Sequence, residues 1–316
     1  MIEQLWDAYR EHHDLAKLEG HCHTGRDWFY LAVLAFADGH DAAAADYATR
    51  AARHETASRV HAAAAEYLTK VGKQGRQQVY TEPEGFAAFI RGGGNVSLYR
   101  ALSAALAERY RSAKPASLLD IGVGDGLALL PALTGDVARV DLLEPSAALL
   151  DATAAALTER GVAHRAANAT LQQLATGVDA WPADTRWELT QSTFALHNIA
   201  RPQRLELLGW LRDHTDRLLI AEFDLRPGSS CEPEWFDYVA TRYEAGLAEY
   251  DGDGGLVAQG FLMPVMFGYF DPATVHHEQS LADWRADLTA AGFTDQREPE
   301  LLHDYWWAPG YLLDVR

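Results

Sequence analysis

One stretch constrains the fold of this chain more than any other: residues 118–130, LLDIGVGDGLALL. A short apolar run ends in three glycines at alternating positions, Gly122, Gly124 and Gly126, and a second apolar run follows. A strand of a parallel sheet that ends in glycines and leads into a helix brings backbone N–H groups close to a bound ligand. The stretch therefore predicts a strand, a ligand-binding loop and a helix.

Several roles compete for this loop. A dinucleotide-binding fingerprint has two residues between its second and third glycines, whereas one residue separates Gly124 from Gly126. A P-loop is excluded because no Gly-Lys-Ser/Thr follows. A tight turn in the core remains an alternative. Asp120, two residues before Gly122, favours a different nucleoside pocket.

Beyond residue 114, short apolar runs alternate with helical stretches. The runs SLLDIG, RVDLLEP, RWELTQSTF and DRLLIAEFD predict strands, with helices near 126–134, 146–160 and 202–215. This alternation predicts an α/β fold with a parallel sheet covered by helices on both faces. Near the end of the chain, TDQREPELL and PGYLLDVR predict an antiparallel strand pair.

We expect two domains. Residues 1–114 have apolar residues at helical spacing and predict an all-helical N-terminal domain, which is a candidate lid and homodimerisation surface. Residues 115–316 hold the sheet and are interrupted by an insertion at 227–271. The insertion begins with a helix and continues with a glycine- and aromatic-rich stretch that we expect to be a mobile loop. Its aromatic residues predict a pocket for an apolar or ring-bearing substrate.

The net charge of the chain limits the classes of molecule that it can bind. The chain has 27 Lys+Arg against 45 Asp+Glu, a formal net charge of −18, and no basic run. Nucleic-acid binding needs a basic face that neutralises phosphates, and anionic membrane surfaces attract the same kind of face. We therefore expect no nucleic acid and no membrane as partners, which leaves a small-molecule substrate or another protein.

The sequence also predicts the compartment and the absence of a metal. No apolar stretch approaches the ~20 residues of a membrane span, and the polar N-terminus does not resemble a signal peptide. Cys22 and Cys231 have neither disulfide-type nor metal-type spacing. His21 and His23, at alternating positions in a predicted loop between helices, do not converge on a metal without further ligands. We expect a cytoplasmic protein with reduced cysteines and no metal site.

Glu144 is the second feature that points to a nucleoside. It follows the second predicted strand, 18 residues after Gly126. An acidic side chain at this place can accept hydrogen bonds from both hydroxyls of a ribose. A solvated glutamate at a strand end is the alternative reading.

The motifs LLDIGVGDG, VDLLEPS and STFALHNI, together with the terminal strand pair, resemble those of the class I (Rossmann-like) S-adenosylmethionine (SAM)-dependent methyltransferases. The resemblance covers about 116–225 and 280–316. It implies a seven-stranded Rossmann-like sheet whose last strand pair is antiparallel, and SAM as the cofactor.

The resemblance also implies roles for single residues. Carried over by motif, the cofactor-binding residues are those of the loop, the ends of the next strands and the segment before the sheet. They are Asp120 for the methionine end, Gly122, Gly124 and Gly126 for close backbone approach, Glu144 for the ribose, Asn168 for the adenine, Ser192 beside the sulfonium, and Asn95 and Tyr99 in a lid with Tyr80, Phe86 and Phe89.

His197 is the first candidate catalytic residue. Its unperturbed pKa near neutrality suits a general base, although it could instead cap the next helix. Tyr80 is the second candidate. Glu222, in the predicted strand DRLLIAEFD, could face the acceptor or be a structural carboxylate.

Three functions fit these observations. The first is SAM-dependent methyl transfer to a small molecule of specialised metabolism. The second is a SAM-using enzyme of the same fold that moves no methyl group and cyclises the aminocarboxypropyl arm of SAM, giving azetidine-2-carboxylate and methylthioadenosine. The third is a non-catalytic binding module. A roomy acceptor cavity would favour the first, a sealed pocket the second, and loss of SAM binding the third.

Overall fold

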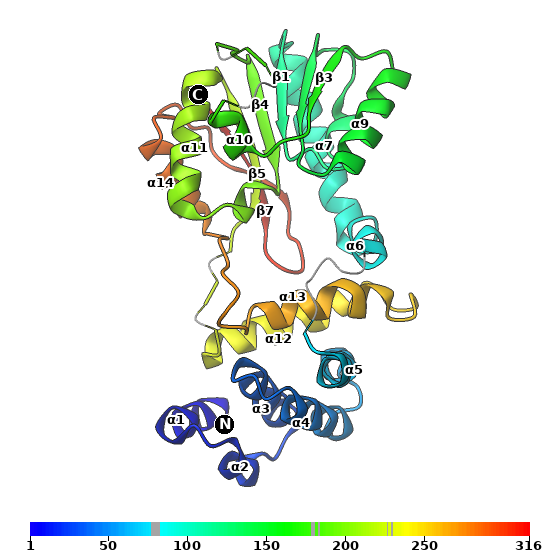
Figure 1. Ribbon diagram of the computed structural model, residues 1–316, viewed down its shortest axis with the longest axis vertical. Coiled ribbons are helices and arrows are strands. Elements are labelled where there is room, and N and C mark those ends of the chain that lie inside the picture. The colour runs from blue at the N-terminus through cyan, green and yellow to red at the C-terminus, as the bar shows by residue number, and fades with distance from the viewer. Residues whose placement is uncertain (77–82, 178–180, 183, 226, 229) are drawn as a thin grey trace. The chain divides into compact units, whose positions relative to one another are not determined.

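The computed structural model describes residues 1–76, 83–177, 181–182, 184–225, 227–228 and 230–316 (Figure 1). The chain forms two compact units, each made of two segments. The first unit is Met1–Val96 with Pro227–His276, and the second is Ser97–Arg226 with His277–Arg316.

The second unit is built on one seven-stranded sheet in the order β3-β2-β1-β4-β5-β7-β6. Every pairing among β1 to β5 is parallel, whereas β7 is antiparallel to both β5 and β6. This confirms the predicted seven-stranded sheet and its antiparallel closing pair. The strands are β1 (Leu118–Ile121), β2 (Val140–Leu143), β3 (His164–Ala167), β4 (Leu189–Thr193), β5 (Leu218–Phe223), β6 (Glu300–His303) and β7 (Gly310–Val315).

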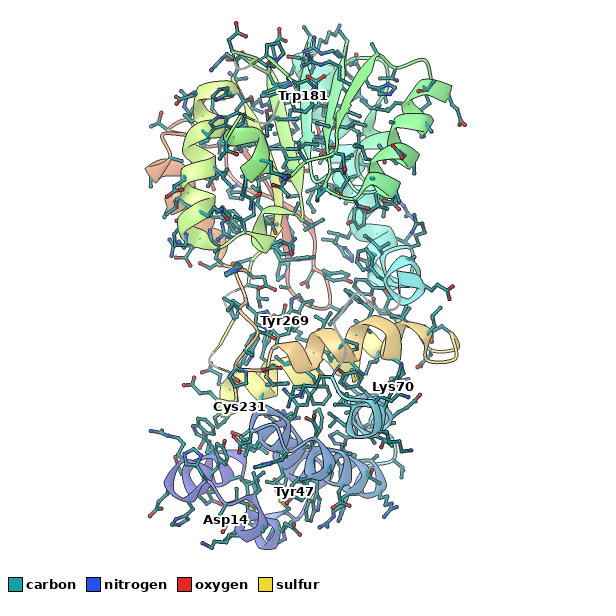
Figure 2. All side chains as sticks on the ribbon, in the orientation of Figure 1. Asp14, Tyr47, Lys70, Trp181, Cys231 and Tyr269 are labelled. Atoms are coloured by element: carbon teal, nitrogen blue, oxygen red, sulfur yellow. The ribbon has the colours of Figure 1, made fainter. Side chains whose placement is uncertain are left out.

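The central strands are apolar because both faces of the sheet are covered. All four residues of β1 and of β2 are buried, as the short continuous apolar runs require. Helices α10 (Leu171–Ala175), α11 (Arg201–His214) and α14 (Leu281–Ala290) cover one face, where their leucines pack with Leu119 and Trp187 (Figure 1). Trp181, labelled in Figure 2, meets Trp187 edge-on at 5.5 Å.

The other face lies under α7 (Gly93–Ala113) and α9 (Ala147–Glu159). Tyr110 of α7 reaches Gln191 of β4, and Ser103 bonds the carbonyl of Ala128 at 3.0 Å. The helix expected at 126–134 is reduced to α8 (Leu129–Ala132). Gly126 has a left-handed φ of 75°, and Pro131 lacks the N–H that a longer helix would use, so only one turn forms.

The first unit is helical throughout its described residues. Its elements, listed in chain order, are α1 (Ile2–His12), α2 (Leu15–Leu18), η1 (Glu19–His21), α3 (Gly25–Ala37), α4 (Asp41–His54), α5 (Arg59–Gln74), α6 (Pro83–Ile90), α12 (Pro233–Ala248), η3 (Ala258–Leu262) and α13 (Met263–Gly268). The helices expected from the spacing of apolar residues in the N-terminal part are present. Tyr47, labelled in Figure 2, bonds Glu19 through its hydroxyl at 3.0 Å.

The compact units differ from the domains expected from sequence. The segment that we predicted as an insertion into the sheet domain is grouped with the N-terminal helices, and the division falls after Val96 rather than after residue 114. The carboxylate of Glu244 in α12 accepts hydrogen bonds from Ser58, Arg59 and Val60, each at 2.9 Å, and so caps the start of α5. The hydroxyl of Tyr30 donates to the carbonyl of Cys231 at 2.7 Å.

The stretch expected to be a mobile loop, within residues 251–271, is largely helical. A π-helical turn, η3, runs into α13, and Met263, Met266 and Phe267 are buried. Apolar residues at helical spacing explain this outcome better than the glycines that suggested a loop. Among the described residues, no helix is both long enough and apolar enough to cross a bilayer.

Candidate cofactor and catalytic site

The candidate site lies at the carboxyl ends of the parallel strands in the second unit. The strand order reverses at β1, which has β2 on one side and β4 on the other. Ligands of open α/β sheets bind at such a switch point. The glycine loop follows β1, Glu144 follows β2 and the turn with His197 follows β4, so the topology brings the three predicted motifs to one edge.

The three loop glycines have left-handed backbones and different surroundings. The φ angles are 69° at Gly122, 56° at Gly124 and 75° at Gly126. A Cβ on Gly122 would lie 2.7 Å from the Cβ of Ala195, and one on Gly126 would lie 2.8 Å from the side chain of Leu130. No described atom lies within 4 Å of a Cβ placed on Gly124. The outer glycines therefore permit close packing, and the middle one leaves an open place above the loop.

Glu144 is tied to this loop. Its carboxylate accepts hydrogen bonds from the N–H of Gly124 at 3.0 Å and from the N–H of Ser146 at 2.9 Å, and its residue is only 7% exposed. Each carboxylate oxygen has a second acceptor position. The side chain is thus fixed in place and can still accept two further hydrogen bonds.

Asn168 lies beside Glu144, after β3. Its amide nitrogen donates to the carbonyls of Glu144 at 3.0 Å and Pro145 at 2.9 Å. Because both amide hydrogens have acceptors, the exposed side chain presents its oxygen as an acceptor. This is the group that the amino nitrogen of an adenine would need.

Asp120 is buried on the face of the sheet that α7 covers. Gln191, its partner across the β1–β4 pairing, donates to one carboxylate oxygen at 2.7 Å, and the hydroxyl of Tyr110 donates to the Gln191 carbonyl. The other carboxylate oxygen, Oδ1, is buried and has no hydrogen-bond partner among the described residues. Burial, assisted by the charge of Glu144 and opposed by the Gln191 hydrogen bond, raises the pKa of Asp120 to about 7. A cationic ligand would satisfy this oxygen and restore its charge.

A strained turn follows β4. Phe194 has a left-handed φ of 53°, which a residue with a Cβ seldom adopts. Its N–H bonds the carbonyl of Ala221 on β5 at 2.9 Å, and the turn that follows places Ala195 against Gly122. Strain of this kind is common at functional sites. The turn joins the glycine loop to the segment that carries His197.

His197 forms a pair with Glu222, the penultimate residue of β5. The ring Nδ1 lies 2.8 Å from one carboxylate oxygen, and the backbone N–H of His197 donates to the other at 3.2 Å. Glu222 is buried and His197 is partly exposed. Burial disfavours the charged imidazole, but the charge and hydrogen bond of Glu222 outweigh it, and the pKa of His197 is raised. An imidazole oriented by a buried carboxylate is a suitable general base.

Aromatic rings stand beside this pair. Phe194 stacks on Phe223 with centroids 4.7 Å apart, and Tyr99 meets Phe194 edge-on at 5.9 Å. Tyr305, between β6 and β7, stacks on Phe223 at 5.5 Å. Phe194, Phe223 and Tyr99 are each partly exposed. The rings form an aromatic cluster at the ends of β4 and β5.

The other predicted residues lie as follows. The hydroxyl of Ser192 donates to the carbonyl of Ile121 at 3.2 Å, which ties β4 to β1. Asn95 belongs to the first unit, where its amide donates to the carbonyl of Phe89 at 2.9 Å and to the hydroxyl of Tyr250 at 3.1 Å. Tyr80 lies outside the described residues. No metal-binding group of three or more His, Cys, Asp or Glu is present in the part of the chain that the structure describes.

Sequence reasoning missed three partners: Gln191, Tyr110 and Arg204. Each is buried and hydrogen-bonds residues that belong to other elements of the fold. Asp120 and Gln191, for example, are 71 residues apart in the chain. Gln191 lies in a strand, LTQST, in which four of the five residues are polar, so its type gave no signal in the sequence.

Comparisons by sequence give no match, either to a protein-family model or to a curated protein. Comparisons by structure do. The magnesium protoporphyrin IX methyltransferase ChlM of Synechocystis PCC 6803 with bound SAH is 15% identical, with a TM-score of 0.49 over 75% of this chain and 96% of that chain. The plantazolicin methyltransferase BpumL in complex with SAH is 10% identical, with a TM-score of 0.48 over 75% and 92%. The mitomycin 7-O-methyltransferase MmcR is 19% identical, with a TM-score of 0.44 over 86% and 71%.

The strand order, the antiparallel β7 and the position of the glycine loop stand on the structure itself. They are the arrangement that the resemblance of the sequence implied. The chain therefore has the Rossmann-like fold of the class I SAM-dependent methyltransferases.

Proposed function

We propose that this protein transfers the methyl group of SAM to a small molecule and that His197 removes a proton from the acceptor. The observation that carries the proposal is the His197–Glu222 pair, 2.8 Å apart, on the turn that contacts Gly122 through Ala195. The turn after β4 thus connects the candidate base, His197, to the glycine loop that is the candidate cofactor-binding site.

The residues at the strand ends fit SAM. The ribose hydroxyls would bond the remaining acceptor positions of Glu144, and the adenine amino group would bond the amide oxygen of Asn168. The α-ammonium group would pair with the buried, unpartnered Oδ1 of Asp120. Gly124 leaves room for the ligand directly above the loop. When bound, SAM supplies an electrophilic methyl group on a sulfonium.

Glu222 determines what His197 can do. With the proton of the imidazole on Nδ1 and directed at Glu222, Nε2 is left with a lone pair. Nε2 would take the proton of an acceptor O–H or N–H as that oxygen or nitrogen bonds the methyl carbon and the bond from this carbon to the sulfonium sulfur breaks. The products are the methylated acceptor, S-adenosylhomocysteine and an imidazolium that Glu222 stabilises. The imidazolium then loses its proton to solvent.

The aromatic rings near the ends of β4 and β5 and the net charge of the chain indicate the chemical class of the acceptor. The rings of Phe194, Phe223 and Tyr99 suit an apolar or ring-bearing molecule, and the net charge of −18 disfavours polyanions such as nucleic acids. We propose a small molecule of specialised metabolism that carries an ionisable O–H or N–H group. With this reaction the protein would be a transferase that uses SAM.

Product analysis by mass spectrometry tests the proposal. The protein is incubated with SAM alone, and then with SAM and a metabolite extract or a panel of phenols and amines. We expect S-adenosylhomocysteine to form only with an acceptor, and to decrease strongly in the His197→Gln variant. Methylthioadenosine from SAM alone would establish the cyclising alternative instead. Absence of both products, with no binding of SAM, would leave a binding module.

A further inference from the structure

Arg204 of α11 is among the most buried charged residues of the second unit, and the function proposed above gives it no role. It is 1% exposed, and no carboxylate of the described residues lies within ion-pair distance of it. Burial lowers the pKa of its guanidinium, although the charges of Glu222 and Asp287 act against this. A buried cation without a paired carboxylate is costly, so its hydrogen bonds call for a functional explanation.

The guanidinium bonds the turn that carries His197. Nη1 donates to the carbonyl of Leu196 at 3.2 Å and to that of Ile199 at 3.0 Å, so it holds the backbone on both sides of His197. Glu222 holds the same turn through the backbone N–H and the ring of His197. The turn that carries His197 is therefore hydrogen-bonded to one buried carboxylate, Glu222, and to one buried guanidinium, Arg204.

The same guanidinium is fixed in turn by the segment at 277–279. Nη1 also donates to the carbonyl of His277 at 3.0 Å, and Nη2 donates to the side-chain oxygen of Gln279 at 2.5 Å. The Gln279 amide nitrogen donates to Asp287 at 2.9 Å, and the Arg204 guanidinium carbon lies 4.4 Å from the centre of the Trp284 ring. Arg204 has few alternative positions, which is what a residue that sets a backbone geometry requires.

We propose that Arg204 is a positioning residue for His197: its guanidinium clamps the Leu196–Ile199 turn against the 277–279 segment and so aims the imidazole at the acceptor. The inference rests on the proposed function of His197 as a base. The positive charge of Arg204 has a second consequence, because this charge disfavours protonation of the His197 imidazole. The charged groups that act on His197 are Glu222 from β5, Glu278 from the 277–279 segment and Arg204 from α11; the two carboxylates favour the imidazolium and Arg204 disfavours it.

Two variants separate position from charge. Arg204→Met removes both, whereas Arg204→Lys keeps the charge but lacks the planar, five-donor guanidinium that bonds the turn and the 277–279 segment together. Arg212→Met, on the same helix with its guanidinium bonded to the carbonyl of Gly292, is the matched control. Gln279→Leu is a milder variant, which loosens the guanidinium and is the fallback if substitutions of Arg204 do not fold.

The first measurement needs no activity: an NMR titration of the His197 ring in labelled protein, assigned with His197→Gln. We expect the pKa of His197 to rise in Arg204→Met by at least a few tenths of a unit, to stay near the wild-type value in Arg204→Lys, and to be unchanged in Arg212→Met. The second measurement is kcat with the SAM Kd. We expect kcat to fall at least about tenfold in both Arg204 variants, about a threefold loss in Gln279→Leu, and an unchanged Kd for SAM in all.

The outcomes are distinguishable. An unchanged pKa of His197 and an unchanged kcat in folded Arg204→Met would overturn the inference. So would a loss of kcat in step with a loss of SAM binding, which would indicate a general structural role. If wild-type protein methylates no acceptor, the proposed function fails, and the titration still reports whether Arg204 acts on His197.

Discussion

At the scale of single residues, Asp120 has the least usual environment in the candidate site. The carboxyl is buried, one oxygen bonds Gln191 and the other has no partner among the described residues. Its pKa of about 7 lies well above the ordinary value of 3.8. Because the pKa is raised in the folded state, Asp120 favours folding fully below about pH 4, and this contribution is lost as pH rises through 7.

The prediction for Asp120 follows from that sign. Asp120→Asn cannot ionise, so its stability relative to wild type should increase between pH 4 and pH 7 and level off above. Three pKa units correspond to about 4 kcal/mol as an upper limit. Urea unfolding of both proteins at pH 4, 6 and 8 measures the difference. Parallel curves at all three values would show that Asp120 is ionised at neutral pH in the folded protein.

His197 and Glu222 give a second prediction at this scale. The base must be neutral to act, so kcat should be lost as pH falls through the pKa of His197. Glu222→Gln removes the charge that raises this pKa, so the acid limb of the pH profile should move to lower pH while kcat falls. His197→Gln should lower kcat by about 10²-fold or more. His164→Gln, on β3, is the control, and an unmoved acid limb in Glu222→Gln would argue against the pair.

At the scale of elements, the loop after β1 combines two demands on its glycines. Gly122 has a left-handed φ and also contacts Ala195 of the β4 turn, whereas Gly124 has a similar φ and an open surrounding. A Cβ in the left-handed region costs roughly 1–2 kcal/mol. A steric clash within packed atoms adds about 1–3 kcal/mol. The same substitution at the two positions therefore separates packing from ligand approach.

We expect Gly122→Ala to lower the free energy of unfolding by about 2–5 kcal/mol, the sum of the two effects. Gly124→Ala should lower it by about 1–2 kcal/mol only. In contrast, Gly124→Ala should raise the Kd for SAM although it changes stability little, because the new Cβ enters the open place above the loop, where we propose that SAM binds. Chemical unfolding and calorimetry measure the two quantities. Equal losses of stability would mean that the Ala195 contact relaxes without cost.

The elements were predictable to different degrees. β1, β2, β5 and β7 are mostly apolar runs, and burial on both faces makes such runs readable in sequence. β4, with the sequence LTQST, is mostly polar, and the run RWELTQSTF predicted it through its β-branched residues and its place between two helices. β3, with the sequence HRAA and one buried residue, has no such run. The short α8 and the helical η3–α13 stretch were not anticipated, because glycines and a proline suggested a full helix in one case and a loop in the other.

The site shows the same division. Asp120, the glycines and Glu144 could be found because each directly follows or ends a strand, so topology alone brings them to one edge. His197 was found by its type and position, but its bond to Glu222 joins residues 25 apart in the chain. Arg204, Gln191 and Tyr110 depend on packing between elements, which no local pattern encodes.

At the scale of the whole molecule, the segment at 227–276 belongs to the helical unit. Its membership is explained by long-range bonds: Glu244 caps α5, and Tyr30 bonds the backbone at Cys231. A chain can leave the sheet unit after β5 and return before α14 without disturbing the sheet, because the crossing occurs at loops.

Homodimerisation through the helical N-terminal region stays a prediction. Light scattering coupled to size exclusion should give a mass of twice 34.8 kDa at micromolar concentration. A mass of 34.8 kDa across the accessible concentration range would show a monomer. A fusion of the N-terminus to a bulky tag serves as the control, because it should weaken association if that region forms the interface.

The most direct test of the central claim, that this edge of the sheet holds SAM, is a calorimetric titration of SAM into the wild-type protein and into Glu144→Ala. Glu159→Ala, an exposed glutamate on α9, is the control. We predict that the wild type binds one SAM per chain. In Glu144→Ala the Kd for SAM should be higher by a factor of about ten or more, because hydrogen bonds to a charged group contribute roughly 1.5–3 kcal/mol each. No binding to the wild type, or equal affinity in a folded Glu144→Ala protein, would contradict the account.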